Sequence, residues 1–481
     1  MQPDVESFFH LRDADLSNAK CRGLACFVAR QSMEKRDEQV DGQLPRVYCL
    51  GKCYAAPASG GDKSRPFIAV HSPRAVVLER IVDGGALTLE DYVGRGGLQA
   101  LQKALALPSE RIVAEMEASQ LRGRGGAGFP TGRKWRSVAA QPDADRRVVV
   151  NLDEGDPGAY IDRFIAELDP YCLLEGMAIA AHAVSADKGT IYVRCEYPQA
   201  VETLQQALAV AHAGSAGFLG SGLRLDVDLV IGHGSYMCGE ETAMLSAIEQ
   251  ERPVARARPP YVSQRGLYGH PTVVNNAETL ASVPWILRNG ADQYAKMGFS
   301  SSRGTKVVSL NSLFRRPGLY EVEFGIPLRH IVEECGGGLR TGQIAGLIVG
   351  GPLAGVIPPT LFDTPFGFEE LHAIGGSVGH GGIVAFDEHT SVADLLHHVF
   401  EFGAYESCGK CTPCRLGCPA IESKFEHALR GELLTANDQQ EYGDILEALR
   451  LTSLCGFGTG LAEFAQSIER HYGQELRTCF K

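Results

Sequence analysis

The sequence of 481 residues has no hydrophobic run long enough to cross a membrane. No stretch approaches the roughly 18 consecutive apolar residues that a transmembrane helix needs. The amino terminus, MQPDVESFFHLRD, also lacks the apolar segment flanked by positive charge that marks an export signal. These absences predict neither membrane insertion nor secretion, and we expect a cytoplasmic protein.

Positive charge is in short supply. Lysine and arginine number 46 against 58 aspartates and glutamates, which gives a net charge of −12 at pH 7. Because phosphate binding needs a basic face, this balance argues against nucleic acid as the main partner.

Internal repeats and low-complexity tracts are also missing. The composition, 44% hydrophobic and 22% charged, is close to the globular average, which excludes a disordered or fibrous protein. At about 150 residues per domain, the length predicts about three domains.

Cysteine, in contrast, is abundant. A chain with 14 cysteines and no export signal is expected in a reducing compartment, where clustered thiols indicate metal or redox chemistry. The clusters lie at the two ends of the chain: Cys21, Cys26, Cys49 and Cys53, and then Cys408, Cys411, Cys414, Cys418, Cys455 and Cys479.

Changes of pattern along the chain predict four regions. Residues 1–92 carry the first cysteine group, and residues 93–300 alternate apolar strands with helix-like segments. Residues 301–390 have short strands broken by glycine and proline, and residues 391–481 show apolar residues at helical spacing. The predicted fold class is therefore α/β, with several domains.

The second region indicates a parallel sheet covered by helices, because strands and helices alternate in it. Ligands of such sheets bind beyond the carboxyl ends of the strands. Three polar loops begin there, at residues 151, 232 and 273. Strands are expected at 147–152, 190–195 and 225–231, and helices at 98–107, 109–119, 171–184 and 199–213.

The segment ESCGKCTPCRLGCP has the cysteine spacing that ferredoxins use for a [4Fe-4S] cluster, from Cys408 to Cys418. We expect a tight turn containing glycine and proline to point these thiolates inward. Zinc is the alternative, but zinc sites usually take two ligand pairs separated by a longer loop. By spacing alone, Cys418 and the remote Cys455 are equal candidates for the fourth ligand.

A glycine-rich segment, LRGRGGAGFPTGRKW, contains a G-x-G-x-x-G pattern at Gly123, Gly125 and Gly128. It follows a predicted helix and not a strand, so it is no ordinary dinucleotide fingerprint, and a surface turn is the alternative. Phe129 and Lys134 favour a ligand, since phenylalanine can stack on a flat ring and lysine can pair with phosphate.

Acidic and amide side chains follow the predicted strands, at Asp153, Glu154, Asp156, Glu240, Glu241, Asn275 and Asn276. Carboxylates accept hydrogen bonds, so they suit ribose hydroxyls and flavin N–H groups. The alternative is that they are ordinary solvated loop residues.

Five motifs resemble one family: GRGGAGFPTGRKW, NLDEGDPGAYIDR, GSYMCGEETAM, PTVVNNAETL and ESCGKCTPCR. Together they are similar to the NADH-binding flavoprotein subunit of respiratory complex I, NAD-reducing hydrogenases and NAD-dependent formate dehydrogenases. The resemblance covers residues 95–481. The segments GGPLAGVIP and GGSVGHGGIVAFDE are most similar to the beta, or diaphorase, subunits of the soluble formate dehydrogenases and hydrogenases.

The resemblance implies a Rossmann-like FMN domain at 93–300, a β-grasp domain at 301–390 and a helical [4Fe-4S] domain at 391–481. It implies that Glu154, Phe129 and Glu241 line the NADH side and that Tyr261 stacks on adenine. Many family members have Ser or Met where this chain has Gly155, so contacts at that position are expected to differ. The implied FMN residues are Gly123, Arg124, Gly125, Lys134, Asn151, Asp153, Tyr236, Gly239, Glu240, Asn275 and Asn276; the implied [4Fe-4S] ligands are Cys408, Cys411, Cys414 and Cys455, with Cys418 an extra thiol.

The cysteines at 21, 26, 49 and 53 resemble the ligands of the thioredoxin-like [2Fe-2S] domain found in partner subunits of these complexes. We therefore expect residues 1–92 to be thioredoxin-like and to have a [2Fe-2S] site. Only 22 residues separate Cys26 from Cys49, fewer than a full domain of this kind needs, so an empty remnant is the alternative.

The implied reaction is reversible hydride transfer between NAD(H) and N5 of FMN, followed by single-electron steps through the [4Fe-4S] cluster. No side chain is expected to act as acid, base or nucleophile, although Glu154 would lie nearby. The expected partners are a thioredoxin-like [2Fe-2S] subunit and a chain with molybdenum, tungsten or nickel–iron. We expect a formate dehydrogenase complex; the alternatives are an NAD-reducing hydrogenase, an NADH:quinone oxidoreductase and a non-catalytic electron relay.

Overall fold

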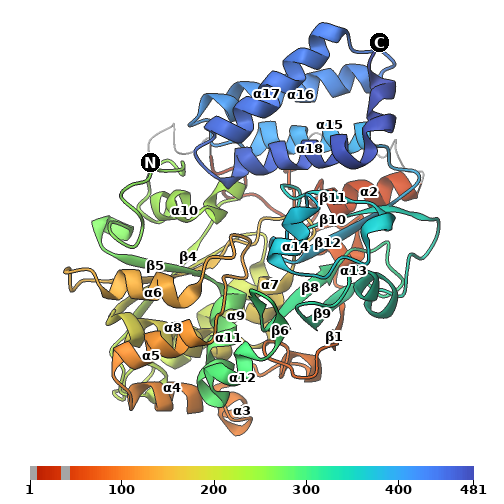
Figure 1. Ribbon diagram of the computed structural model, residues 1–481. Coiled ribbons are helices and arrows are strands. Elements are labelled where there is room, and N and C mark those ends of the chain that lie inside the picture. The colour runs from red at the N-terminus through yellow and green to blue at the C-terminus, as the bar shows by residue number, and fades with distance from the viewer. Residues whose placement is uncertain (1–7, 34–43) are drawn as a thin grey trace.

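The computed structural model describes residues 8–33 and 44–481. Two main sheets lie side by side, and the C-terminal helices lie across one end of both (Figure 1). This arrangement confirms the predicted α/β class with a parallel sheet.

The first sheet has four parallel strands in the order β4-β3-β2-β5. The chain adds β3 and β4 on one side of β2 and then returns to place β5 on the other side, so the order reverses between β2 and β5. In sheets of this kind that reversal opens a ligand crevice at the carboxyl ends of the strands. The strands are β2 (Arg147–Leu152), β3 (Lys188–Val193), β4 (Asp226–Ile231) and β5 (Thr272–Asn276).

Helices cover this sheet at nearly the positions predicted from the sequence. Helix α8 is buried almost from end to end, because it packs against both α11 and β2. The helices of this part are α4 (Gln99–Leu105), α5 (Ser109–Ala118), α6 (Thr131–Ala139), α7 (Ile161–Leu168), α8 (Pro170–Val184), α9 (Pro198–Ala211), α10 (Glu241–Ile248), α11 (Ala277–Asn289) and α12 (Ala291–Ala295).

The second sheet has six strands in the order β1-β9-β8-β12-β10-β11. Strands β8 and β9 form an antiparallel pair, and β8 runs parallel to β12 at the centre of the sheet. Its elements are β1 (Phe67–Val70), β8 (Thr305–Leu310), β9 (Gly318–Glu323), α13 (Leu328–His330), the wide turn η6 (Ile331–Cys335), β10 (Ile344–Val349), β11 (Val356–Ile357), α14 (Phe368–Ala373) and β12 (Gly382–Asp387).

The N-terminal region does not form a sheet of its own within the described residues. Its named strand, β1, pairs in parallel with β9 of the six-stranded sheet. The carboxylate of Glu321 on β9 then accepts backbone hydrogen bonds from Val76, Val77 and Leu78, which fixes the segment after β1. The expectation of a separate thioredoxin-like sheet is therefore wrong for the part of the chain that the structure describes. Besides β1, this region contains α2 (Leu24–Ser32), η1 (Cys53–Ala55) and α3 (Leu89–Gly94).

The C-terminal region is helical, as predicted. One correction concerns the cysteine run, where the expected tight turn spans only its start. Helix α16 begins at Thr412, next to Pro413, a residue well suited to the first turn of a helix, and it includes Cys414 and Cys418. The helices are α15 (Val392–Glu406), α16 (Thr412–Leu429), α17 (Ala436–Thr452) and α18 (Gly456–Leu476).

A continuous hydrophobic core connects the N-terminal region, the parallel sheet and the C-terminal helices, and a second core fills one side of the six-stranded sheet. None of the helices in the described parts of the chain is both long and apolar enough to span a membrane.

Candidate functional site

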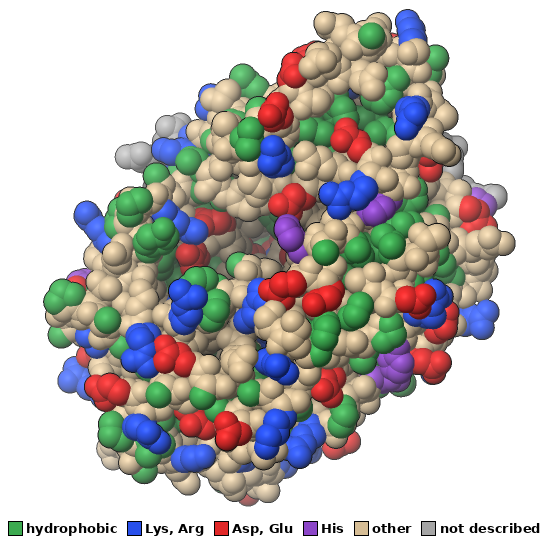
Figure 2. Space-filling view, viewed as in Figure 1, with side chains coloured by type: hydrophobic (Ala, Val, Ile, Leu, Met, Phe, Trp, Pro, Cys, Tyr) green, Lys and Arg blue, Asp and Glu red, His purple; other side chains and the backbone are tan. Residues whose placement is uncertain are grey.

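The crevice at the carboxyl ends of β2 and β5 gathers most of the predicted FMN residues. Asp153 and Glu154 follow the end of β2. The sequence predicts a loop at Asn275 and Asn276, but in the structure these two residues are the last of β5. The amides belong to the strand because β5 pairs with β2 as far as the register Asn276 to Asn151. On this side the surface of the molecule is hollowed below the C-terminal helices (Figure 2).

Asp153 has a buried acceptor atom without a donor. Its side chain is only 5% exposed, and burial raises the pKa of the carboxyl well above its usual value. Arg194 Nε lies 3.6 Å from Oδ1, whereas Oδ2 has no hydrogen-bond partner among the described residues. A buried polar atom normally finds a partner, so a ligand with N–H or O–H groups fits this position.

The glycine-rich loop lies directly against the end of β5. A Cβ atom added at Gly125 would come within 2.8 Å of Cβ of Asn276, and Gly126 has a φ of +117°, which side chains rarely adopt. Glycine is therefore required for this close approach. The approach leaves the loop backbone bordering the crevice, where a ligand can contact it.

Arg124 anchors this loop instead of facing the crevice. Its side chain is buried, and it donates hydrogen bonds to Tyr294 Oη at 2.6 Å and to the carbonyl of Arg303 at 2.8 Å. Its guanidinium also lies 4.8 Å from the ring centre of Phe324. The FMN contact implied for Arg124 stays a prediction, and the role that the geometry gives this side chain is to fix the loop.

The predicted amides hold the loops of the crevice together. Asn151 Nδ2 donates to the carbonyl of Gly239 at 2.9 Å, which joins the end of β2 to the loop after β4. Trp135 Nε1 donates to Asn275 Oδ1 at 2.8 Å, which joins α6 to β5. These two hydrogen bonds thus connect β2 to the loop after β4, and β5 to the helix that follows the glycine-rich loop.

Glu154 lies beneath the crevice. It is fully buried, and its carboxylate accepts backbone hydrogen bonds from Ile161, Asp162 and Arg163 at the start of α7. Burial raises the pKa of Glu154 to about 7, and the neighbouring charge of Asp162 adds to the rise. The structure thus gives Glu154 a capping role, and its predicted place on the NADH side stays a prediction.

His380 is the residue of this site that the sequence analysis missed. It comes from the loop before β12, in the other sheet, and its Nε2 lies 2.9 Å from Asp162 and 3.3 Å from Glu154. Burial alone would lower the pKa of His380, but the charges of Asp162 and Glu154 outweigh it and raise the pKa to about 9. Its GHGG segment belongs to one of the motifs of the family resemblance, but that motif assigns no role to the histidine.

Replacing His380 with glutamine should flatten the pH dependence of stability. Its folded-state pKa, about 9, exceeds the unfolded value of about 6.5, so the charged imidazole stabilises the fold fully below pH 6.5. That stabilisation, about 3 kcal/mol, is lost as the pH rises through 9. Urea unfolding at pH 6 and pH 9.5 measures it, and an equally steep decline in His380→Gln would contradict the assignment.

The residues predicted for the NADH side lie at the rim. Lys134 Nζ is 3.2 Å from one oxygen of Glu241, and Arg258 is 3.1 Å from the other. Burial raises the pKa of Glu241, but these two cations outweigh it, so the pKa is lowered and the carboxylate stays charged. Phe129 and Tyr261 are 47% and 56% exposed, as side chains that stack on a ligand from solvent would be.

The predicted [4Fe-4S] ligands come together where helices begin. Cys411 and Cys455 immediately precede α16 and α18, Cys408 lies in the loop before α16, and Cys414 is in its first turn. Helix N-termini favour negative charge, which suits thiolates and an anionic cluster. A Cβ at Gly458 would come within 2.7 Å of Cys414 Sγ, so the glycine lets α18 approach this site.

The cysteine site is next to the crevice. The charge of Glu240, which caps α10, acts on Cys455, as do Cys408 and Cys414. Tyr236, in the loop before Glu240, donates its backbone N–H to Glu406 at the end of α15.

Two family models match the chain. Residues 116–285 match the Nuo51 FMN-binding domain, and residues 394–479 match the NADH-ubiquinone oxidoreductase-F iron–sulfur binding region. An F-type chain of the NADH-quinone oxidoreductase of Rhizobium meliloti (strain 1021) is 40% identical over 393 residues, which cover 81% of this chain and 93% of the relative. The chain belongs to the F-type family of NADH-quinone oxidoreductase subunits.

Two further proteins connect this F-type family with hydrogenases. Subunit HndC of the NADP-reducing hydrogenase of Solidesulfovibrio fructosivorans is 38% identical over 376 residues, covering 77% of this chain and 76% of HndC. A crystal structure of an NAD⁺-reducing [NiFe]-hydrogenase in the H₂-reduced state matches 99% of this chain and 87% of the other, with a TM-score of 0.81 and 28% identity. The chain is thus an oxidoreductase subunit with FMN, a [4Fe-4S] cluster and NAD(H) as substrate.

Proposed function

We propose that the chain is the diaphorase subunit of a multi-subunit NAD-dependent formate dehydrogenase. The observation that carries the diaphorase assignment is the loop at residues 236–241. It is bonded to the end of β2 through Gly239, its Tyr236 contacts Phe457 of α18, and the charge of its Glu240 acts on Cys455, which precedes α18. These contacts support a flavin site and an iron–sulfur site that lie close to each other.

When bound, FMN accepts electron pairs as hydride from a nicotinamide and releases them singly, which is the conversion a diaphorase needs. The residues of this chain orient the two ligands. The free oxygen of Asp153 accepts a hydrogen bond, and the loop around Gly125 offers backbone N–H groups. Phe129 and Tyr261 provide stacking faces at the rim. Catalysis then depends on positioning and on electrostatics.

The purified chain tests this function directly. It should be yellow-brown, release FMN on denaturation and reduce ferricyanide with NADH. Bound flavin and iron without NADH-dependent activity would favour the alternative of a non-catalytic relay.

Replacing Glu241 with glutamine should weaken the preference for NADH over NADPH. A carboxylate that meets the adenosine ribose repels a 2′-phosphate, and Lys134 and Arg258 keep Glu241 charged. Without its charge, those two cations become available to the phosphate. We expect the ratio of kcat/KM for NADH over NADPH to fall by about tenfold, which is about 1.4 kcal/mol. An unchanged ratio would remove this role from Glu241.

The same proposal includes a second cluster, because the N-terminal cysteines are arranged as two pairs. Cys49 Sγ and Cys53 Sγ lie 3.8 Å apart, and Cys21 and Cys26 hydrogen-bond each other. Two thiolates on one tetrahedral metal lie about 3.8 Å apart, given a metal–sulfur distance near 2.3 Å. A [2Fe-2S] cluster has two such irons, each with two cysteines.

The surroundings of these four thiols also suit a cluster. All four are at most 2% exposed, and the backbone N–H groups of Gly23, Gly51 and Ala58 donate to Cys21, Cys49 and Cys26. Such N–H to sulfur hydrogen bonds help to set the potentials of iron–sulfur clusters.

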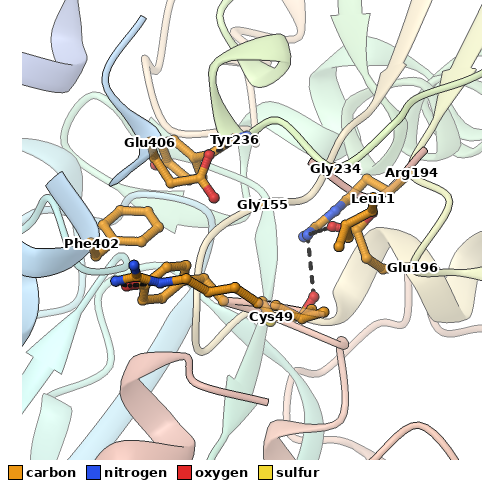
Figure 3. A pocket seen from close by; sticks show the side chains of 12 residues that line it. Leu11, Cys49, Gly155, Arg194, Glu196, Gly234, Tyr236, Phe402 and Glu406 are labelled. Atoms are coloured by element: carbon orange, nitrogen blue, oxygen red, sulfur yellow. Dashed lines mark hydrogen bonds and ion pairs between the residues drawn. The ribbon is translucent and has the colours of Figure 1, made fainter. Parts of the chain in front are cut away.

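Arg194 connects this quartet to the crevice. Its guanidinium donates to the carbonyl of Cys49 at 3.2 Å and pairs with Glu196 (Figure 3). It also donates to the carbonyl of Glu154. It borders a small polar cavity that Tyr236 and Glu406 also line. These contacts support an electron path between the flavin site and the N-terminal cluster.

Replacing Cys49 with alanine should remove the N-terminal cluster only. Iron should fall by about two atoms per chain, and the [2Fe-2S] signal should vanish from the EPR spectrum. Cys172→Ala, which alters a buried thiol of α8, is the matched control and should keep its iron. Equal iron in wild type and Cys49→Ala would instead mean that the quartet is an empty remnant.

The proposal of formate as the substrate of the complex rests on the segments GGPLAGVIP and GGSVGHGGIVAFDE, which resemble the beta subunits of soluble formate dehydrogenases and hydrogenases. The strand order β9-β8-β12-β10 supports a β-grasp domain. We propose as partners a thioredoxin-like [2Fe-2S] subunit and a chain with molybdenum, tungsten or nickel–iron. We also propose that the complex lies in the cytoplasm, a reducing compartment, because none of the 14 cysteines, all within the described residues, forms a disulfide. NAD⁺ reduction by the purified complex, driven by formate but not by H₂, tests the substrate; the reverse result favours a hydrogenase.

A further inference from the structure

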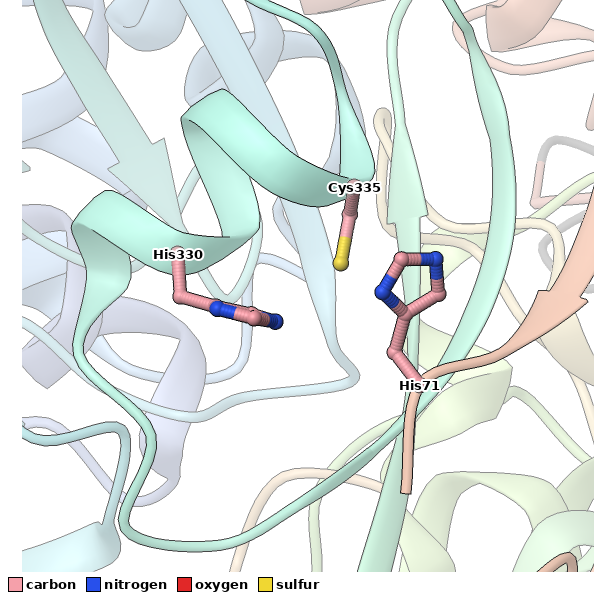
Figure 4. Close-up of side chains that lie close together, drawn as sticks. All are labelled: His71, His330 and Cys335. Carbon is pink, nitrogen blue, oxygen red and sulfur yellow. The ribbon is translucent and has the colours of Figure 1, made fainter. Parts of the chain in front are cut away.

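Two histidines and a cysteine meet at the outer side of the six-stranded sheet, away from the crevice. One ligand atom from each of His71, His330 and Cys335 lies within 4.8 Å of the other two. The thiol points toward the space between the two imidazole rings (Figure 4). We propose that these three side chains bind a transition-metal ion of the Zn²⁺ class, with water as the fourth ligand.

Two separate parts of the chain build this group. His71 directly follows β1, and its backbone N–H donates to the carbonyl of Glu321 at 2.8 Å, which continues the pairing of β1 with β9. His330 ends α13, and Cys335 ends η6. The site therefore joins the N-terminal region to the six-stranded sheet.

The wide turn of η6 is what brings the cysteine to the histidine. In a regular α-helix, residues five apart lie about 140° apart around the axis, so they face different sides. Here Gly336 N–H bonds to the carbonyl of Ile331 at 2.9 Å, five residues back, in a π-type turn. Such turns bring residues five apart close to one face, and they are frequent at functional sites.

The ligand atoms have no other hydrogen-bonding partner. Within residues 8–33 and 44–481, no hydrogen bond involves the ring nitrogens of His71 and His330 or the thiol of Cys335; the two rings contact each other edge to face, with centroids 6.1 Å apart. Imidazole nitrogen and thiolate sulfur are both zinc ligands, and a zinc site with three protein ligands keeps its fourth position for water.

Two charged side chains, Arg316 and Glu334, act on both Cys335 and His71. A thiol loses its proton when it binds a metal, so the affinity of this site for the metal should increase with pH.

A metal bound at this site would restrain the position of β1. This four-residue strand lies at the edge of the sheet, where it pairs only with β9, and its Ile68, Ala69 and Val70 are partly buried. A metal that connects His71 to Cys335 would hold its C-terminal end in place.

Zinc binding by the holoprotein tests the inference. Protein with its clusters and flavin in place is stripped of loose metal with a chelator, dialysed against ZnCl₂ and analysed for zinc and iron. We expect about one equivalent of zinc per chain and a higher thermal unfolding temperature. His71→Ala and Cys335→Ser should each weaken zinc binding by at least about tenfold and lose the thermal shift.

Matched controls separate this site from other thiols. His372→Ala, an exposed histidine of α14, and Cys172→Ser, a buried thiol of α8, should bind zinc as the wild type does. Iron content and NADH–ferricyanide activity should stay constant in all four variants. Zinc bound equally by His71→Ala and wild type, or no stoichiometric zinc in the wild type, would overturn the proposal.

Discussion

The Cys455→Ala variant is expected to lose the [4Fe-4S] cluster while it keeps its FMN. Cys455 is the predicted ligand that immediately precedes α18, whereas the other three predicted ligands lie at the start of α16 and in the loop before it. With three thiolates left, the cluster has an open corner next to the rim of the crevice. Iron should fall by about four atoms per chain, and the EPR signal of the reduced cluster should disappear. Flavin fluorescence after denaturation should be unchanged.

The matched control is Cys418→Ala. Cys418 is fully buried one turn further along α16 and lies close to Cys414, so it shares the environment of the ligands. This variant should keep its iron and lose only about 1 kcal/mol of stability, because a small buried side chain is shortened. The opposite pair of results, cluster lost in Cys418→Ala and kept in Cys455→Ala, would reverse the assignment of the fourth ligand.

Cys418 and Cys455 also show how far the spacing of cysteines along a chain can predict the ligands of a cluster. The run from Cys408 to Cys418 identified the type of cluster, because local spacing determines how closely thiolates can gather. Spacing left the fourth ligand open, since the position of Cys455 depends on how α18 packs against α15 and α17, which are long-range contacts. The expected turn was also wrong beyond Cys411, because Pro413 is compatible with the first turn of a helix and α16 starts there.

The crevice was predictable for the same local reason. Alternating strands and helices predicted a parallel sheet, and polar residues after each strand predicted a ligand site at its carboxyl edge. His380 could not be found this way, because it arrives from the six-stranded sheet through a contact that no local pattern encodes. Arg124 shows the reverse case, since its motif predicts a ligand contact while Tyr294 and Arg303 engage its side chain.

In the N-terminal region, the cysteines of the predicted [2Fe-2S] site lie in a fold that differs from the expected thioredoxin-like domain. The cysteine spacing led us to expect a thioredoxin-like domain, and in the structure the thiols do gather as two pairs. The supporting sheet is different, because β1 joins β9. A short chain between Cys26 and Cys49 leaves little room for strands of its own, so the larger core of the neighbouring sheets takes over this support.

The Gly125→Ala variant is expected to bind FMN much more weakly. The added methyl group would lie 2.8 Å from Cβ of Asn276, whose side chain caps α11 and donates to Asp162, so the glycine-rich loop must move instead. Overpacking of this kind costs about 1–3 kcal/mol. If the displaced loop must return to its place for FMN to bind, this energy corresponds to roughly 5- to 150-fold weaker binding.

Titration of the apoprotein with FMN, followed by quenching of flavin fluorescence, measures this effect. Gly443→Ala is the matched control, because no atom lies within 4 Å of a Cβ added at that position in α17. It should bind FMN normally and be slightly more stable, since alanine favours a helix interior over glycine by about 0.5–1 kcal/mol. Unchanged FMN affinity in Gly125→Ala would mean that this loop does not border the flavin, and the crevice would then need another ligand.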